Sequence, residues 1–213
     1  LVVRALRDRG KNVRFIYSWD DYDVFRKVPA NMPEPEVLEK YLRYPITEVP
    51  DTTGRNENYA RHHEVDIEKQ LPRVGIHPEF LYQASRYRAN RYAEGMKKAM
   101  QNRDVIKECL NEYRDEQHKM KPEDVYWPVA VFCDKCSRDT TEITGYDGEW
   151  NVSYKCECGN CETVDLRTFK GAKLGWRVDW PMRWNEEKVV FEPGGKDHIS
   201  PGGSYDTAKL VSK

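Results

Sequence analysis

Five of the six cysteines lie close together in the second half of this 213-residue chain. A structural zinc ion takes four thiolates, and two close cysteine pairs joined by a short β-rich segment are typical of a zinc ribbon. The segment between the pairs, residues 141–154, is rich in β-branched residues and turn glycines. We therefore expect a zinc-ribbon-like module over residues 123–170. The clustered cysteines are Cys133, Cys136, Cys156, Cys158 and Cys161.

The spacing determines the ligands of this zinc only in part. Cys133 and Cys136 form a Cys-x-x-Cys pair and make up the first half of the site. For the second half the spacing allows Cys158 with Cys161, Cys156 with Cys158, or Cys156 with Cys161. We favour Cys158 with Cys161, because two residues separate them as in the first pair, and keep Cys156 as the substitute. Four sulfur ligands leave no open position on the ion, so the zinc should be structural.

The charge of the chain gives no reason to expect a nucleic-acid or membrane surface as a partner, because 35 Lys and Arg residues stand against 36 Asp and Glu, a net charge of −1. No apolar run approaches the roughly 20 residues of a membrane helix, and no signal peptide opens the sequence. We expect a cytoplasmic protein without a membrane partner. The missing secretory signal also favours metal binding over a disulfide framework for the cysteines.

Both ends of the sequence have helical patterns. Val2, Val3 and Leu6 fall on one stripe of a helix that Gly10 ends, and residues 204–213 form another helix-like run without a stop signal. We interpret the chain as an internal piece of a longer protein.

A strand predicted at residues 12–19 runs into the acidic turn Asp20–Asp23. A helix, a turn and a strand make half of an α/β unit, and ligands of open α/β sheets bind beyond the carboxyl ends of the strands. Asp20 and Asp21 are therefore candidate binding residues. The alternative is an acidic surface turn that only caps the next helix.

The middle of the chain is expected to be helical. Residues 28–58 carry five prolines and predict mostly loop, with one short helix near Val37–Tyr44. Residues 59–114 have a helical pattern, in which one helix should begin at Pro78–Glu79 and another should span Asp104–Tyr113. Arginines beside tyrosines in the first of these fit either a solvated face over an aromatic stripe or an RNA-facing surface.

The C-terminal segment contains a tryptophan-rich stretch and a glycine-rich loop. Three tryptophans fall within residues 175–184, and Val189–Phe191 predicts a short strand. In the loop that follows, Gly195-Lys196-Asp197 suits a ribose, because a carboxylate accepts hydrogen bonds from vicinal hydroxyls. His198 is placed to stack on a ligand or to hydrogen-bond it. The alternative is a structural turn, since a glycine-rich loop alone is a weak signal.

Several stretches together resemble the class I lysyl-tRNA synthetases, and the similarity spans essentially the whole chain. Three of them carry most of the resemblance, and two others are similar to the helical insert of that family. The former are Tyr17–Pro29, Trp176–Trp184 and Gly195–Asp206, and the latter are Tyr59–His62 and Leu71–Ile76.

The resemblance implies an α/β fold with an incomplete Rossmann-type catalytic domain formed by residues 1–30 and 171–213. A helical connective insertion, residues 31–122, and the zinc-ribbon-like module would interrupt it. Such an enzyme activates lysine with ATP, bound with Mg, to lysyl-adenylate and transfers lysine to tRNA(Lys). The implied partners are thus lysine, ATP and tRNA(Lys), and the implied cofactor is a structural zinc.

The resemblance also implies roles for residues of the lysine site. Asp20 matches the acidic residue that holds the α-ammonium group, with Asp21 as its support or substitute. Trp176 and His198 would form the pocket for the lysine side chain, where an aromatic face and a polar group meet a long stem with an ammonium tip.

The implied ATP site lies in the glycine-rich loop. Gly195 and Asp197 match the Gly-x-Asp that holds the ribose in class I synthetases. Gly202, Gly203 and Ser204 would begin the following helix near the nucleotide.

Two other functions compete with a lysine–tRNA ligase. One is a non-catalytic zinc-ribbon module that binds RNA through the arginine- and tyrosine-rich helices. The other is a related class I synthetase for glutamate or cysteine. A glutamate pocket needs a cationic side chain, and a cysteine enzyme selects its substrate with a zinc thiolate; Trp176 with His198 and a closed zinc site favour neither.

The 213 residues contain neither the HIGH-like nor the KMSKS-like signature of the class. Those motifs neutralise the triphosphate as the lysine carboxylate attacks the α-phosphorus, a stabilisation that is electrostatic. We therefore predict that the isolated 213 residues form no adenylate at a useful rate, as measured by lysine-dependent pyrophosphate exchange. Turnover close to that of a complete enzyme would contradict this prediction.

Overall fold

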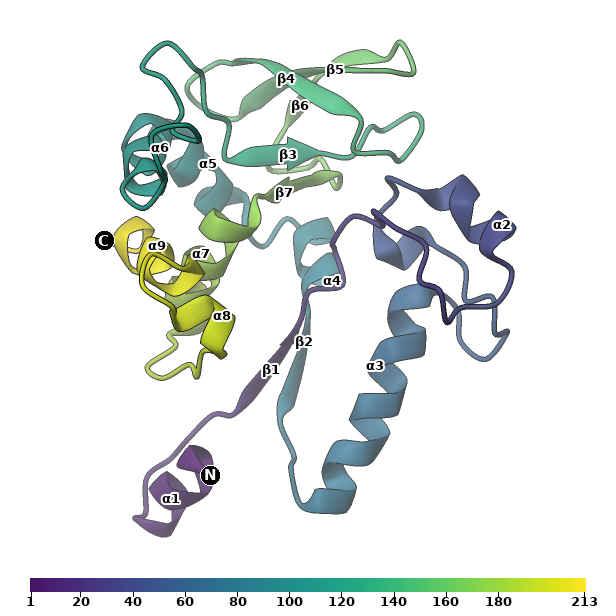
Figure 1. Cartoon of the computed structure of the whole chain (residues 1–213), viewed down its shortest axis with the longest axis vertical. Coiled ribbons are helices and arrows are strands. Elements are labelled where there is room, and N and C mark those ends of the chain that lie inside the picture. The colour runs from purple at the N-terminus through teal and green to yellow at the C-terminus, as the bar shows by residue number, and fades with distance from the viewer. The chain divides into compact units, whose positions relative to one another are not determined.

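A computed structural model describes residues 1–213 as a mixed α/β protein with three small sheets (Figure 1). The chain divides into two compact units. Unit 1 consists of Leu1–Ala89 with Ser137–Asp139, and unit 2 consists of Asn90–Cys136 with Thr140–Lys213. None of the helices combines the length and the apolar character that crossing a membrane requires.

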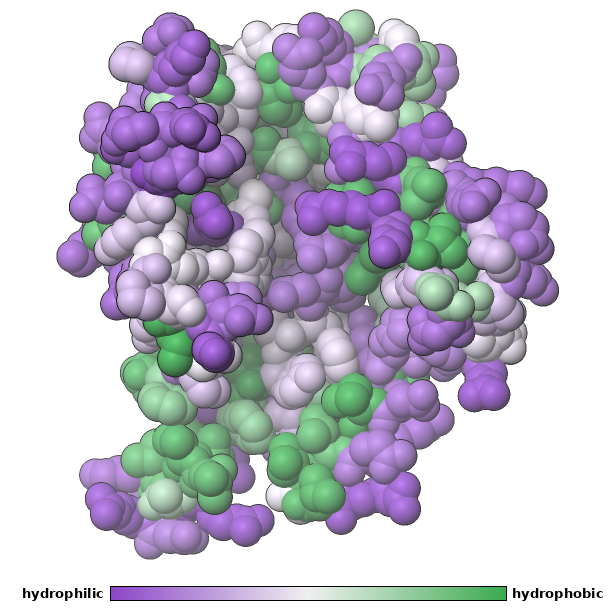
Figure 2. All heavy atoms as spheres, viewed as in Figure 1, coloured by the Kyte–Doolittle hydropathy of each residue, from purple (hydrophilic) through white to green (hydrophobic).

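Unit 1 begins with α1 (Val2–Asp8), which ends before Gly10, a residue with a φ of 72°. Positive φ is readily available only to glycine, so the predicted stop of this helix is confirmed. α1 buries none of its residues. Its exposed apolar side chains belong to the hydrophobic area at the lower left of Figure 2.

Two strands of unit 1 pair in parallel. β1 (Ile16–Trp19) runs beside β2 (Glu79–Tyr82), with Trp19 opposite Tyr82. The prediction of a helix beginning at Pro78–Glu79 was therefore wrong: the helix, α4 (Gln83–Arg88), begins after the strand. Phe80, Leu81 and Tyr82 suit a strand, and pairing with β1 satisfies backbone groups that a helix would otherwise satisfy internally.

The rest of unit 1 is mostly short helices. α2 (Pro35–Leu38) continues into a 3-10 helix at Glu39–Tyr41, and a further one lies at Ile46–Glu48. α3 (Tyr59–Gln70), whose first turn is capped by the Asn58 side chain, leads into a 3-10 helix at Leu71–Val74. A small core holds this region together and consists of Phe25, Met32, Leu38 and Val49.

Two helices open unit 2. α5 (Ala93–Gln101) precedes α6 (Arg103–Asn111), which agrees with the helix predicted at Asp104–Tyr113. Tyr92, directly before α5, and Met96 and Met100 within it are buried.

The sheets of unit 2 are antiparallel. β3 (Val129–Val131) pairs with β7 (Ala172–Leu174). A second sheet has the order β4-β5-β6 and consists of β4 (Thr141–Tyr146), β5 (Asn151–Cys156) and β6 (Cys161–Asp165).

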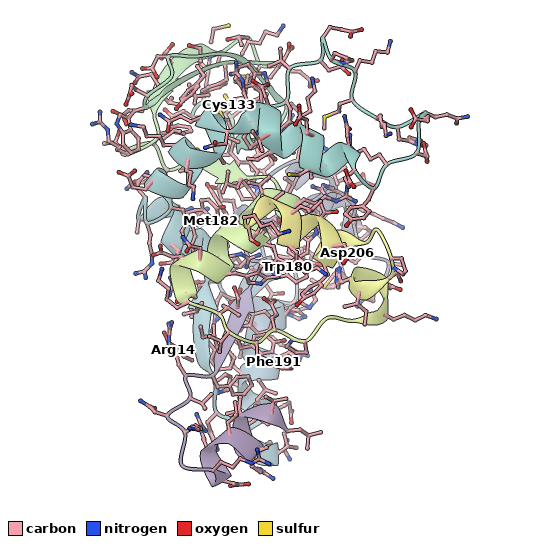
Figure 3. All side chains as sticks on the ribbon, turned by 90° about the vertical axis from the view of Figure 1, so that its left-hand side faces the viewer. Arg14, Cys133, Trp180, Met182, Phe191 and Asp206 are labelled. Carbon is pink, nitrogen blue, oxygen red and sulfur yellow. The ribbon has the colours of Figure 1, made fainter.

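Three helices complete unit 2: α7 (Trp176–Glu187), α8 (Lys196–Ile199) and α9 (Ser204–Val211). The strand predicted at Val189–Phe191 is absent, because no neighbouring strand pairs with these residues. Val190 is 98% exposed and Phe191 57% exposed, so the segment after α7 leaves apolar side chains in solvent (Figure 3).

Candidate functional site

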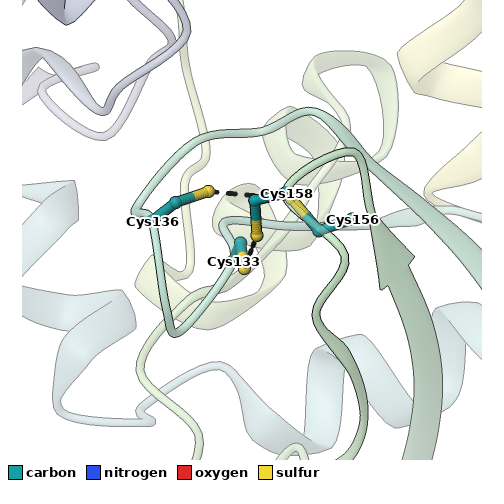
Figure 4. Close-up of side chains that lie close together, drawn as sticks. All are labelled: Cys133, Cys136, Cys156 and Cys158. Atoms are coloured by element: carbon teal, nitrogen blue, oxygen red, sulfur yellow. Dashed lines mark hydrogen bonds between the residues drawn. The ribbon is translucent and has the colours of Figure 1, made fainter.

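Four cysteine sulfurs of unit 2 come together beside the three-stranded sheet. They belong to Cys133, Cys136, Cys156 and Cys158, and all four Sγ atoms lie within 4.8 Å of one another (Figure 4). The Sγ atoms of Cys133 and Cys158 are 3.7 Å apart, as are those of Cys136 and Cys156.

The spacing of these sulfurs fits a tetrahedral metal ion. Two thiolates bound to zinc at about 2.3 Å in a tetrahedron lie roughly 3.8 Å apart, close to both pair distances. A disulfide needs sulfurs at about 2 Å, and all six cysteines are free thiols. The cluster can therefore hold one metal ion with four sulfur ligands and no open position.

The structure differs from the preferred second pair. It brings Cys156 with Cys158 to the first pair, which was the substitute choice, and Cys161 lies outside the cluster as an exposed residue at the start of β6. The reason is the turn between β5 and β6, where the Cys156 backbone N–H donates to the Asn160 carbonyl at 2.8 Å. That bond folds Cys156 and Cys158 back toward the first pair.

Hydrogen-bonding groups around the cluster prepare it for a cation. The Asn160 side-chain amide donates to the Cys133 sulfur at 3.6 Å, and the Thr140 hydroxyl lies 3.6 Å from the Cys156 sulfur. Burial raises the pKa of the Cys133 thiol, but hydrogen bonds from the backbone N–H groups of Cys136 and Lys135, together with those from the neighbouring thiols, outweigh it and lower that pKa to about 6. A thiolate is the form that binds metal.

We predict that Cys156→Ser lowers the bound metal well below one ion per chain and lowers the melting temperature, since a hydroxyl is a poor replacement for a thiolate ligand. Cys161→Ser is the matched control and should keep both the metal and the melting temperature. Metal content is measured after native purification by elemental analysis. The reverse pattern, with loss of metal only in Cys161→Ser, would show that the cluster uses the other pair.

The two aspartates predicted to bind a ligand follow β1 in unit 1, and their environments differ. Asp20 is exposed, whereas Asp21 is only 6% exposed and accepts a 2.8 Å hydrogen bond from the backbone N–H of Ala84, at the start of α4. Both line a cavity of about 370 Å³, whose walls include the rings of Tyr17 and Trp19. Asp21 thus contacts the start of α4, a helix distant in the sequence and not the next one, while Asp20 is exposed directly after the strand.

Burial is the main cause that raises the pKa of Asp21, to about 6, and the nearby Glu64 carboxylate adds to it. The hydrogen bond from Ala84 acts in the opposite direction and is too weak to offset burial. Because the folded state holds the proton more tightly than the unfolded chain does, ionisation of Asp21 opposes folding. This destabilisation is absent below pH 3.8, grows as the pH rises, and is complete above about pH 6.

We predict that Asp21→Asn stabilises the fold at pH 7.5 by on the order of 2 kcal/mol and has little effect at pH 3.5, because the amide keeps the acceptor oxygen but carries no charge. Urea unfolding at the two pH values measures the difference. Asp23→Asn, at an exposed carboxylate in the same turn, controls for the change in net charge. Equal stabilisation by Asp21→Asn at both pH values would contradict the raised pKa of Asp21.

The two residues expected to hold the lysine side chain lie side by side in unit 2. The rings of Trp176 and His198 have centroids 6.0 Å apart, and Trp176 stacks on Trp180 at 5.0 Å with an interplanar angle of 13°. Trp176 is 40% exposed, which leaves part of its ring open to a ligand. Sequence reasoning missed Trp180 as a neighbour of both rings, although tryptophans at positions i, i+4 and i+8 of one helix share a face.

The residues expected to bind ATP are spread over two short elements of unit 2. Gly195 caps α8, on which Asp197 is an exposed residue, so the Gly-x-Asp lies at a helix start and not directly after a strand. Gly203 precedes Ser204 at the start of α9, and a Cβ at Gly203 would lie 2.6 Å from the His198 carbonyl oxygen. A side chain cannot fit there, so the close approach of these two segments requires glycine.

The N-terminus of α9 is partly occupied by its own chain. Gly202, with a φ of 73°, donates its backbone N–H to the Asp206 carboxylate at 3.1 Å. Lys209 in turn lies 2.8 Å from Asp206. Gly202, Gly203 and Ser204 therefore form a tight, capped turn in this structure.

Comparison with known proteins identifies the class. A family model described as "tRNA synthetases class I (K)" matches residues 1–213, which is the whole chain. The chain therefore belongs to the class I tRNA synthetases, in the family of the lysine (K) enzymes.

The relatives are named for one amino acid. The chain is 57% identical over 212 residues to "Lysine--tRNA ligase" of Treponema pallidum and 45% identical over 213 residues to that of Pyrococcus horikoshii, with the whole chain covered in both. A ligase of the same name from Streptomyces coelicolor is 36% identical over 99% of the chain. The chain spans about 40% of the length of the first two relatives and 42% of the third.

Proposed function

We propose that this chain is part of a lysine–tRNA ligase that activates lysine with ATP and transfers it to tRNA(Lys) in the cytoplasm. The observation that carries the proposal is the match of all 213 residues to the lysine family of class I synthetases, with bacterial and archaeal relatives of one name. This favours lysine over the glutamate and cysteine alternatives, and an enzyme over a non-catalytic RNA-binding module.

In this proposal, β1 and β2 are two strands of a Rossmann-type catalytic domain, which moves Glu79–Tyr82 out of the helical insertion expected at residues 31–122 and into that domain. Their parallel pairing supports it, because parallel strands occur almost only in α/β folds. The acidic turn after β1 then lies at the carboxyl end of a strand, where such folds bind ligands. Residues 123–170 form the zinc ribbon, for which four clustered sulfurs beside a three-stranded antiparallel sheet are the support.

Lysine offers two ammonium groups to its site. Asp20 would hold the α-ammonium through its exposed carboxylate, and Asp21 would support the turn from its buried position. Trp176 would lie along the apolar stem and present a π face to the ε-ammonium, an attraction worth roughly 0.5–2 kcal/mol depending on desolvation. His198, next to the Trp176 ring, would supply a polar contact.

ATP, with Mg, would bind at the glycine-rich segments of unit 2. The Asp197 carboxylate would accept hydrogen bonds from the ribose hydroxyls, and Gly195 would leave room for the sugar, since a Cβ there would meet only the His198 ring at 3.9 Å. Gly202, Gly203 and Ser204 would lie near the nucleotide. Attack of the lysine carboxylate on the α-phosphorus would then give lysyl-adenylate and pyrophosphate.

We predict that Asp20→Asn in the full-length ligase lowers kcat/KM for lysine by at least about 10-fold, as loss of one charged hydrogen bond costs roughly 1.5–3 kcal/mol. Trp176→Ala should raise the KM for lysine to a similar degree and leave the KM for ATP unchanged. Lysine-dependent pyrophosphate exchange measures both.

Asp23→Asn provides the matched control for Asp20→Asn, because it removes a charge from the same turn. If Asp20→Asn and Trp176→Ala both keep wild-type kinetics, these residues do not contact lysine. If the unmodified full-length protein shows no lysine-dependent pyrophosphate exchange, the proposed activity is wrong.

A further inference from the structure

One carboxylate in unit 2 accepts hydrogen bonds from two tryptophans at once. Trp180, on α7, donates its indole N–H to Oε1 of Glu192 at 2.8 Å, and Trp184 donates to Oε2 of the same residue. Glu192 is half-buried on the segment that follows α7. Both oxygens of one charged group are thus used to fix two neighbouring rings.

These two rings support the pair proposed to hold the lysine side chain. Trp180 stacks on Trp176 at 5.0 Å and meets the His198 ring at 5.7 Å with an interplanar angle of 61°. Trp184 lies 5.0 Å from Trp180, and Tyr205 of α9 packs edge-on against both of these indoles. Trp180 is therefore the ring through which an effect on Glu192 reaches both Trp176 and His198.

An indole has a single N–H, so a hydrogen bond to it determines which way the ring faces. A bond to a charged acceptor is roughly twice as strong as one between neutral groups. With Trp180 and Trp184 both bound to Glu192, neither ring can turn without breaking a charge-assisted hydrogen bond. Trp176, which is 40% exposed, then rests on a ring of fixed orientation.

The same carboxylate brings a negative charge to the back of the aromatic row. A hydrogen-bond acceptor on an indole N–H, here those of Trp180 and Trp184, shifts electron density toward that ring. The face of a tryptophan attracts cations because of its electron density. The negative charge of Glu192 behind the rings attracts the ε-ammonium group of lysine and repels an acidic side chain.

We propose that Glu192 is a positioning residue for lysine recognition, which holds Trp180 and Trp184 so that Trp176 and His198 present a surface of fixed orientation to the substrate side chain. This rests on the proposed function, in which Trp176 and His198 contact lysine. Glu192 does not itself touch the substrate in this account.

The rival explanation is purely structural, with Glu192 only attaching residues 188–195 to α7. The two explanations differ in what a substitution changes. A positioning role affects lysine binding and leaves ATP binding and turnover nearly unchanged, whereas a lost attachment also disturbs α8, which carries Asp197 of the proposed ATP site.

The decisive variant is Glu192→Gln in the full-length ligase, assayed by lysine-dependent pyrophosphate exchange. The side-chain amide offers one acceptor oxygen, and its NH₂ group faces the second indole N–H, so one of the two rings is released. We expect the KM for lysine to rise about 10-fold, with kcat and the KM for ATP within about threefold of the wild type.

Two further variants separate the two hydrogen bonds from general effects. Trp184→Phe removes one indole N–H but keeps a ring in the row and leaves the Trp180 bond intact, so we expect a smaller rise in the KM for lysine than in Glu192→Gln. Glu186→Gln makes the same carboxylate-to-amide change on α7, where Glu186 pairs with Arg91 at 3.1 Å, and should keep wild-type kinetics.

Near-UV circular dichroism gives a readout that does not depend on activity, because coupled tryptophans report their mutual orientation. Glu192→Gln should change this spectrum while the melting temperature stays within a few degrees of the wild type. A change in the spectrum with an unchanged KM for lysine would overturn the proposal.

The outcomes distinguish this proposal from the proposed function. If Trp176→Ala raises the KM for lysine but Glu192→Gln does not, the lysine site stands and the role of Glu192 is refuted. If neither variant changes it, the assignment of the lysine site fails as well. If Glu192→Gln changes the KM for ATP, kcat and the melting temperature together, Glu192 is a structural attachment and the proposal is wrong.

Discussion

The convergence of four sulfurs constrains how the strands of unit 2 are arranged, because the cysteines lie at or just beyond the ends of β3 and β5. Cys133 follows β3 after one intervening residue, Phe132; β3 pairs with β7, and β7 leads through Gly175 into α7 at Trp176. The pairing is close: beyond the strands, Phe132 donates its N–H to the Gly171 carbonyl at 2.8 Å, and a Cβ on Gly171 would lie 2.7 Å from the Phe132 carbonyl oxygen. One strand pair thus connects the cysteine cluster to the start of the aromatic row.

The acidic turn of unit 1 combines residues with opposite requirements. A carboxylate that binds an ammonium group has to be accessible, and Asp20 is exposed. Asp21 beside it is buried and holds the start of α4, although burial raises its pKa and makes its charge unfavourable. A buried acid next to a candidate binding turn fits the general observation that residues near functional sites are seldom those that would stabilise the fold most.

Sequence reasoning succeeded where local chemistry decides the outcome. The cysteine cluster, the helix stop at Gly10 and the proximity of Trp176 and His198 all follow from residue types at short spacing or from family resemblance. It failed at residues 79–82 and 189–191, because whether an apolar run becomes a strand depends on a partner strand that no local pattern reveals. The choice between Cys156 and Cys161 depended on a turn geometry that spacing does not determine.

The parallel pair of unit 1 shows how a small sheet is held. Two strands alone are marginally stable in water, so β1 and β2 need other support. An ion pair and a hydrogen bond provide part of it: Arg14 before β1 pairs with Glu79 of β2 at 2.6 Å, and the Tyr82 hydroxyl at the other end of β2 donates to Glu68 of α3 at 2.8 Å. Because the second contact lies where β2 ends beside the end of β1, it fixes the strand end from which Asp20 extends. The helix α3 is therefore part of what positions the candidate lysine-binding turn.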